Sequence, residues 1–169
     1  TYYIRHDTTA DQMIELMLKR FSEVWNREFA ELARQKGLSV YQVVTVASMV
    51  EKEALFDSER RRIAGVIYNR LREGMPLQVD ATVLYSLGGH KERVTYKDLE
   101  VDSPYNTYRN TGLPPGPIAS PGAASISAAL QPEEHDYYYY VATPDGHHVF
   151  SKTYSEHLKA KNENRGKSN

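Results

Sequence analysis

Residues 39–54 read SVYQVVTVASMVEKEA, and this stretch decides the fold. Its apolar side chains recur at helical spacing, with Val46 and Met49 off the main stripe, which predicts a helix over 40–56 after the capping residue Ser39. A helix that is apolar on most of its sides is a buried one. We therefore expect this helix inside the domain, with the run Glu51-Lys52-Glu53 near its C-terminal end.

The same kind of spacing predicts helices on both sides of this one. Apolar residues recur over 8–35, and Gly37 ends that helix. A third helix begins at Asp57 or Ser58 and stops before Gly74. Shorter pieces follow: a helix over 81–87 capped by Asp80 and closed by Gly88 and Gly89, an exposed loop over 90–94, and one helical turn over 95–100.

The C-terminal half adds a long loop and a hairpin. We expect, in chain order, a loop rich in proline and glycine over 102–122, a helix from Ser120 and Pro121 to about Leu130, strands over 137–142 and 147–151, and a last helix that starts with the capping box of Thr153 and Glu156. The predicted class is α+β: a mostly helical single domain with a small antiparallel β-hairpin or sheet.

The composition narrows the class of protein. The 21 Lys and Arg residues nearly balance the 22 Asp and Glu, which argues against a nucleic-acid partner bound through a broad basic field. Without cysteine, the chain has no disulfide, thiolate metal site or cysteine nucleophile. No run reaches the roughly 18 apolar residues of a membrane span, and no signal peptide is visible. Because the sequence opens at Thr1, we expect an anchor or targeting segment upstream, and membrane contact only through it.

Two glutamates on the central helix are the main candidates for chemistry. Buried helices rarely carry carboxylates unless these are paired or functional, and burial raises the pKa of a carboxyl so that it can donate a proton near neutral pH. The helical rotation places Glu51 at the centre of the apolar stripe and Glu53 on its flank. A flank suits a catalyst that touches substrate, and the centre suits a partner for an arginine. The alternative for either glutamate is a structural ion pair with an arginine of the run 60–62 or with Arg70, and Asn69 with Arg70 can orient one of them.

Two further groups can contact a sugar. Residues Tyr105-Asn106-Thr107-Tyr108 place hydroxyls and an amide on a loop stiffened by proline, and the alternative is a loop bonded to itself. Gln78 and Asp80 follow a proline, and Asp80 has the competing task of capping a helix. The 13 tyrosines of the chain fit this interpretation, because tyrosine combines a flat apolar face with a hydroxyl.

Metal and cofactor chemistry is not indicated. His147 and His148 are neighbours on a predicted strand, so we expect them to point to opposite faces rather than form a bidentate pair. The sequence also lacks the H-E-x-x-H, G-x-S-x-G, phosphate-loop and dinucleotide patterns. We therefore expect neither a metal ion nor a cofactor.

Five motifs stand in order over roughly residues 40–160: ASMVEKEA at 47–54, YNRL at 68–71, GMPLQ at 74–78 with Asp80 and Thr82, YNTY at 105–108, and GLPPG at 112–116 with IASPG at 118–122. Together they resemble the MltG/YceG family of endolytic murein transglycosylases. The resemblance implies that Glu53 is the catalytic residue. Many members have threonine after it, whereas this chain has Ala54, so no hydroxyl acts there.

The resemblance also implies a setting. It divides the chain into an N-terminal helical segment over 1–39, a catalytic domain over 40–163 and a polar tail over 164–169. It implies peptidoglycan glycan strands as substrate, peptidoglycan synthases as partners, an upstream membrane anchor with a small LysM-like domain, and a place at the outer side of the cytoplasmic membrane. Two alternatives stay open: a lysozyme-like muramidase that uses water, and a glycan-binding scaffold that does not cut.

Overall fold

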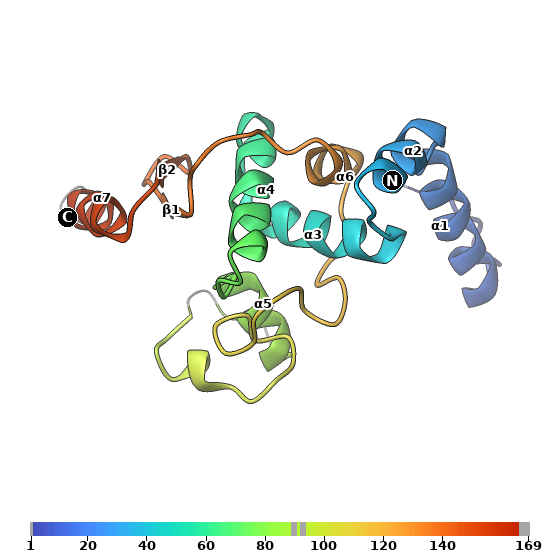
Figure 1. Cartoon of the computed structure of the whole chain (residues 1–169). Helices are drawn as coiled ribbons and strands as arrows, with labels where there is room; N and C mark the ends of the chain where they lie inside the picture. Colours follow the sequence, from blue (N-terminus) through green and yellow to red (C-terminus); the bar gives the residue numbers. More distant parts are fainter. Residues whose placement is uncertain (1, 89–90, 92–93, 166–169) are drawn as a thin grey trace.

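The computed structural model describes residues 2–88, 91 and 94–165. Figure 1 shows a mostly helical chain with one small hairpin, which confirms the predicted α+β class. The elements are α1 (Ala10–Val24), α2 (Arg27–Gln35), α3 (Val40–Glu53), α4 (Asp57–Arg72), α5 (Asp80–Leu87), the 3₁₀ turn η1 (Asp98–Glu100), α6 (Ala123–Leu130), β1 (Tyr139–Ala142), β2 (His148–Ser151) and α7 (Tyr154–Arg165). Among the described residues, no helix is long and apolar enough to cross a membrane.

Helix α3 lies at the centre of the fold, as its sequence predicts. It packs against α4 and α6, and the side chains of Val43, Met49 and Val50 are completely buried. Burying side chains of this size contributes roughly 1.5–3 kcal/mol each. The helix ends three residues earlier than predicted, because Ala54 adopts an extended conformation and Glu53 becomes the last helical residue.

The predicted single helix over 8–35 is wrong, because α1 and α2 are separate. The Asn26 side chain accepts a hydrogen bond from the amide of Phe29 at 3.0 Å and so begins a new helix. Trp25 leaves the helical conformation before it, while its ring stacks on Phe21 at 6.1 Å. The apolar periodicity continues through this break and so predicts one helix. Asparagine is a common N-cap residue, and Asn26 therefore indicates the start of a second helix independently of the apolar pattern.

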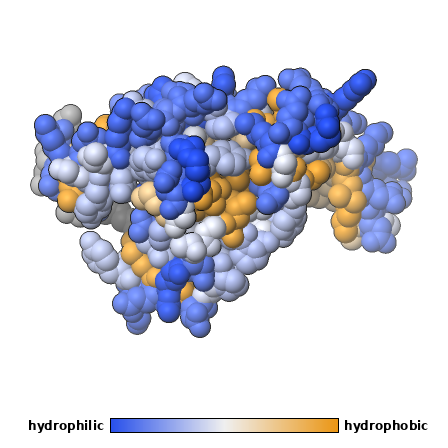
Figure 2. Space-filling view, in the orientation of Figure 1, coloured by the Kyte–Doolittle hydropathy of each residue, from blue (hydrophilic) through white to orange (hydrophobic). Residues whose placement is uncertain are grey.

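Helix α1 buries none of its residues and extends away from the core. Figure 2 shows hydrophobic residues along α1 at the edge of the molecule. Three of its apolar side chains, Ile14, Met17 and Leu18, are between 46% and 60% exposed. Helix α2 differs from α1, because its Ala33 is buried in the core and Phe29 and Leu32 pack against it.

Two predicted helix caps are wrong. Val79 is the N-cap of α5 and Asp80 is its first residue, because the Asp80 carboxylate accepts a hydrogen bond from the Tyr108 hydroxyl instead of capping. Gly122 is the N-cap of α6, in place of Ser120 followed by Pro121. The Gly122 amide donates to a carboxylate oxygen of Glu51 at 3.2 Å, which ties the start of α6 to α3.

The hairpin and the last helix pack together beside α4. Strands β1 and β2 are antiparallel, with Tyr139 opposite Ser151 and Ala142 opposite His148. They begin two residues and one residue later than predicted. Helix α7 packs against both strands and includes the first two residues of the predicted tail. Residues 166–169 of that tail, Gly89, and positions 90, 92 and 93 of the predicted loop lie outside the described residues.

Candidate active site

A cavity of about 320 Å³ lies where the end of α3 meets α4, the start of α5, the hairpin and α7. Glu53 enters it from the last turn of α3. Aromatic and polar groups share the walls with a few apolar ones. The remaining lining residues are Arg70, Leu77, Gln78, Asp80, Tyr108, Tyr139, Tyr140, Val141, Ala142, His148, Tyr154 and His157.

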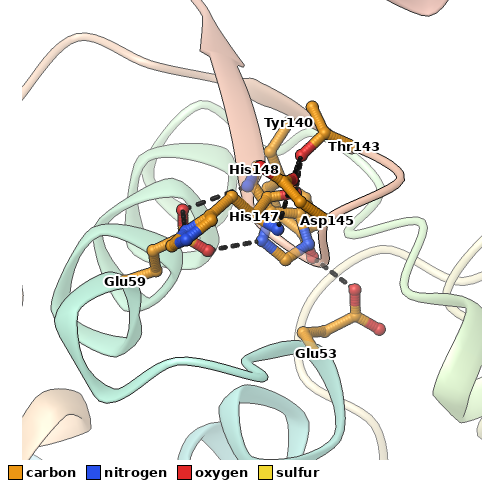
Figure 3. A network of polar contacts seen from close by, with 7 residues as sticks. All are labelled: Glu53, Glu59, Tyr140, Thr143, Asp145, His147 and His148. Atoms are coloured by element: carbon orange, nitrogen blue, oxygen red, sulfur yellow. Dashed lines mark hydrogen bonds and ion pairs between the residues drawn. The ribbon is translucent and has the colours of Figure 1, made fainter. Parts of the chain in front are cut away.

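The Glu53 carboxyl is set up to hold a proton. Burial raises its pKa from 4.5 to about 7, and the negative charge of Asp80 adds to the rise. The Tyr140 hydroxyl donates a hydrogen bond to Oε2 of Glu53 at 3.1 Å, as Figure 3 shows, and the backbone amide of Ala81 donates another. Both hydrogen bonds lower the pKa of Glu53, but by less than burial raises it. Near pH 7 the group therefore exchanges between acid and base forms.

Asp80 is the second carboxylate of the cavity. It is exposed, and it accepts a hydrogen bond from the Tyr108 hydroxyl. Burial and the adjacent carboxylate raise the pKa of Tyr108, so this phenol keeps its proton. The pair therefore presents a carboxylate and an aromatic ring on the wall formed by α5 and the loop after η1.

Arg70 links three segments of the chain at the cavity. Its Nε donates to the carbonyl of Tyr138 at 2.6 Å, and its Nη1 donates to the carbonyls of Pro76 and Leu77 at 3.0 and 2.9 Å. Its guanidinium also lies over the ring of Tyr139, 5.1 Å from the centroid. Burial lowers the pKa of Arg70, yet an arginine stays charged in proteins. This cation therefore joins α4 to the hairpin and to the segment before α5.

Gln78 carries backbone strain at the rim of the cavity. Its φ of 54° is the only positive value of a non-glycine residue in the described part of the chain. Such a conformation costs on the order of 1–3 kcal/mol and is found where surrounding contacts enforce it. Here the side chain accepts a hydrogen bond from Arg70 at 3.1 Å, and the amide donates to the carbonyl of Thr107 at 3.1 Å.

Comparison with known proteins identifies the family. A sequence model of the YceG-like family matches residues 1–163.

The chain belongs to the YceG-like family.

Three relatives support the assignment. The YceG-like chain is 50% identical over 155 residues to the endolytic murein transglycosylase of Bacillus subtilis (strain 168), covering 92% of the chain and 43% of the relative. It is 37% identical over 147 residues to the protein of that name from Streptococcus pneumoniae serotype 2 (strain D39), covering 84% of the chain and 26% of the relative. The crystal structure of a yceG-like protein from Listeria monocytogenes superimposes with a TM-score of 0.87 at 46% identity, over 94% of the chain and 51% of that structure. The chain thus spans about half or less of the length of the proteins it matches.

The cavity around Glu53 brings together five of the residues singled out from the sequence, namely Glu53, Arg70, Gln78, Asp80 and Tyr108. Glu51 and Asn69 lie outside its lining. Glu51 forms an ion pair with Arg60 at 3.3 Å and accepts a hydrogen bond from Ser125 at 2.6 Å, which is the structural alternative weighed for these glutamates.

Asn69 serves the approach to the hairpin. Its side-chain amide donates to the carbonyls of His135 and Tyr137 at 2.8 and 3.0 Å. These bonds hold the segment between α6 and β1 against α4, so Asn69 fixes the strand that carries Tyr140 without reaching the cavity itself.

Most of the predicted loop is bonded to the protein rather than open to a ligand. The Asn106 side-chain amide donates to the carbonyls of Leu99 and Val101, both at 2.9 Å. The Thr107 hydroxyl accepts from the amide of Val79 at 3.0 Å. Tyr105 packs against Tyr85, with ring centroids 4.8 Å apart. Of the four residues over 105–108, only Tyr108 lines the cavity.

Sequence reasoning missed the wall formed by the hairpin and α7. Tyr139 and Tyr140 lie on β1, and His148 on β2. The signal was present in the run of four tyrosines over 137–140. It could be read as a strand, but nothing in it shows that the strand faces the end of α3.

The expectation that His147 and His148 point to opposite faces is wrong. Both Nδ1 atoms contact the Glu59 carboxylate, at 3.3 and 2.8 Å (Figure 3). His147 precedes β2 and belongs to the turn, so the alternation of a strand does not apply to it. Its ring stacks on Phe56 instead, with centroids 4.0 Å apart.

Proposed function

We propose that this chain is the catalytic domain of a lytic transglycosylase that cleaves the β-1,4 bond between N-acetylmuramic acid and N-acetylglucosamine in peptidoglycan. The observation that carries the proposal is Glu53, a carboxyl with a pKa of about 7 in a cavity of about 320 Å³. The name of the Bacillus and Streptococcus relatives, endolytic murein transglycosylase, supports the substrate class.

Glu53 acts first as an acid. In its protonated form it donates its proton to the glycosidic oxygen, and the bond from that oxygen to C1 of the muramic acid breaks. Positive charge then develops on the ring, and we assign its stabilisation to the carboxylates of Glu53 and Asp80, which both line the cavity. The new Glu53 carboxylate keeps the hydrogen bonds from Tyr140 and from the amide of Ala81, which stabilise the charge that it has just acquired.

The same group then acts as a base. The C6 hydroxyl of the muramic acid gives its proton to the Glu53 carboxylate, and its oxygen bonds to C1. This closes a 1,6-anhydro ring, consumes no water and returns Glu53 to its acid form. A pKa near the working pH suits a residue that performs both transfers, and such catalysis contributes roughly 10²–10⁴-fold.

The other residues of the site fall into two groups: some contact the sugar, and the others position the residues that do. We assign contact with the substrate to Gln78, Asp80 and Tyr108, and on the hairpin to Tyr139 and Tyr140, all of which line the cavity. The Asn106 side chain accepts a hydrogen bond from the amide of Tyr108 at 3.0 Å. We assign Tyr105, Asn106 and Thr107 the role of fixing Tyr108. We assign Glu51, Asn69 and Arg70 the role of fixing the helices and strands around Glu53.

Cleavage inside a strand requires a groove that continues past the cut. A second hollow of about 440 Å³ shares Asp80 and Tyr108 with the cavity of Glu53 and continues along Thr95, Tyr96 and Lys161. This continuity supports binding of further sugar units beyond Asp80 and Tyr108. It agrees with the word endolytic in the names of the relatives.

The rival function is that of a muramidase, a hydrolase. It is favoured by one observation, the presence of Asp80 as a second carboxylate in the cavity, since glycosidases use one carboxyl as acid and another as base or nucleophile. Against it, Asp80 is occupied by the Tyr108 hydroxyl. The transglycosylase proposal therefore assigns Asp80 an electrostatic role rather than activation of water.

The mass of the released fragments separates these functions. Purified peptidoglycan is treated with the protein and with Glu53→Gln and Asp80→Asn variants, and the new ends are read by mass spectrometry. Anhydro ends that disappear with Glu53→Gln support the proposal. Reducing ends, heavier by one water, would establish the muramidase. Tight binding with no new ends would establish a glycan-binding scaffold.

The setting of the full-length protein follows from the substrate. Peptidoglycan lies outside the cytoplasmic membrane, so we propose that the protein acts in the cell envelope. Anchoring through an upstream segment and partnership with peptidoglycan synthases are proposals that derive from the family resemblance.

A further inference from the structure

The carboxylate of Glu59 is buried at the start of α4, outside the catalytic residues named above. Glu59 is only 7% exposed. One oxygen accepts a hydrogen bond from the backbone amide of His148 at 3.0 Å and lies 3.3 Å from Nδ1 of His147, and the other lies 2.8 Å from Nδ1 of His148. Burial is the largest single influence and raises the pKa of this carboxyl, but the hydrogen bonds from the ring and amide of His148, the charge of that ring and the bond from His147 together lower it by more. Glu59 is therefore an ionised acceptor.

This carboxylate decides which nitrogen of His148 carries the proton. A carboxylate can only accept, so Nδ1 of His148 must be the donor. In a neutral imidazole the other nitrogen, Nε2, is then left as an acceptor. A partner that fixes one ring nitrogen in this way also fixes the orientation of the ring.

The His148 ring stands between Glu59 and the cavity. Its side chain is 7% exposed and lines the cavity with Glu53. The ring meets that of Tyr140 edge to face, with centroids 5.3 Å apart, and Tyr140 in turn bonds to Glu53 (Figure 3). Across residues 2–88, 91 and 94–165, Nε2 of His148 has no hydrogen-bond partner. Nε2 is not among the buried side-chain atoms left without a partner in the described part of the chain, so it is accessible from the cavity that His148 lines and can bond to a ligand there.

We propose that Nε2 of His148 accepts a hydrogen bond from an O–H or N–H group of the bound amino sugar, and that Glu59 is the positioning residue that holds the proton of the neutral ring on Nδ1. The inference rests on the proposed function for its substrate class. It adds a binding contact from strand β2 to the lining of the cavity.

Two amide substitutions separate binding from folding. His148→Asn keeps an amide near the Nδ1 position, facing Glu59, and has no atom at the Nε2 position. His148→Gln reaches the Nε2 position with an amide. His147→Asn is the matched control, because His147 shares the Glu59 carboxylate but does not line the cavity.

Affinity is measured by calorimetry in a Glu53→Gln background, with soluble peptidoglycan strands whose stem peptides have been removed. A lost hydrogen bond predicts that His148→Asn weakens binding about tenfold while His148→Gln stays within about threefold. The His147 control should bind unchanged. Equal weakening by both His148 variants together with a lowered melting temperature would reduce His148 to a structural role and overturn the inference.

The outcomes also distinguish this inference from the proposed function. Affinity that depends on His148 in a protein that releases no anhydro ends would overturn the transglycosylase proposal and leave the binding contact standing. Anhydro ends with an unimpaired His148→Asn variant would do the reverse. Failure of every variant to bind the strands would overturn both.

Nitrogen-15 spectra of the histidine rings test the role of Glu59 directly. With the ring neutral, His148 should carry its proton on Nδ1 in the free protein. Glu59→Gln should move that proton to Nε2, because the amide can turn an N–H toward the ring, and affinity should fall about tenfold as in His148→Asn. A proton on Nε2 in the unsubstituted protein would overturn the assignment of Glu59.

Discussion

Replacing Glu53 by glutamine should stabilise the protein in a way that depends on pH. A glutamine has the same shape and no proton to lose, so the comparison isolates the cost of ionising this half-buried carboxyl. The pKa of Glu53 is about 7 in the folded chain against 4.5 for an ordinary glutamate. Because one pKa unit corresponds to about 1.4 kcal/mol, the full difference is about 3 kcal/mol.

The sign follows from proton binding. Between the unfolded and the folded pKa, the native state holds one proton more than the unfolded chain, so raising the pH through this window lowers the free energy of unfolding. The contribution is fully present below pH 4.5 and is lost by the time the pH has passed 7. Between about pH 5 and about pH 8, the unsubstituted protein should lose roughly 2–3 kcal/mol relative to Glu53→Gln.

Urea unfolding of both proteins at these two pH values measures the effect. The comparison should use the difference between the variants, because all other titrating groups cancel in it. A gap that stays constant between the two pH values, or one that narrows toward higher pH, would refute the argument that burial raises the pKa of Glu53.

Three other predictions address neighbouring contacts. Tyr140→Phe removes a hydrogen bond that favours the carboxylate of Glu53, so the fall of cleavage rate at high pH should move upward by about one pH unit, as a pH–rate profile will show. Glu51→Gln breaks the ion pair with Arg60 and should cost about 1 kcal/mol in urea unfolding while reducing cleavage far less than Glu53→Gln does. Gly65→Ala would place a methyl group 2.5 Å from a backbone carbonyl of the segment after α6, so it should lower stability by about 1–3 kcal/mol in the same unfolding assay.

The sequence predicts the elements of this fold well where periodicity and caps agree. The central helix has both a capping serine and an apolar stripe, and α3 is buried as predicted. The prediction of a single helix over 8–35 was wrong because the apolar pattern continues through the break at Asn26. The prediction that Asp80 caps α5 was wrong because its carboxylate accepts a hydrogen bond from a tyrosine 28 residues away, which no local rule can anticipate.

The candidate site could be predicted only in part for a similar reason. The flank position of Glu53 on its helix is a local property, and the cavity includes that residue. Residues over 105–107 have suitable chemistry, but their bonds to the backbone are set by the tertiary structure. The hairpin wall with Tyr140 and His148 depends on how β1 and β2 pack against α3 and α4, and periodicity carries no information about such packing.

The central claim is that Glu53 keeps its proton up to neutral pH and uses it for cleavage. Carbon-13 titration of the Glu53 carboxyl, followed beside the pH dependence of anhydro-end release, tests it most directly. Both curves should share a midpoint near pH 7. A carboxyl that titrates near 4.5, or release that continues undiminished in Glu53→Gln, would contradict the account.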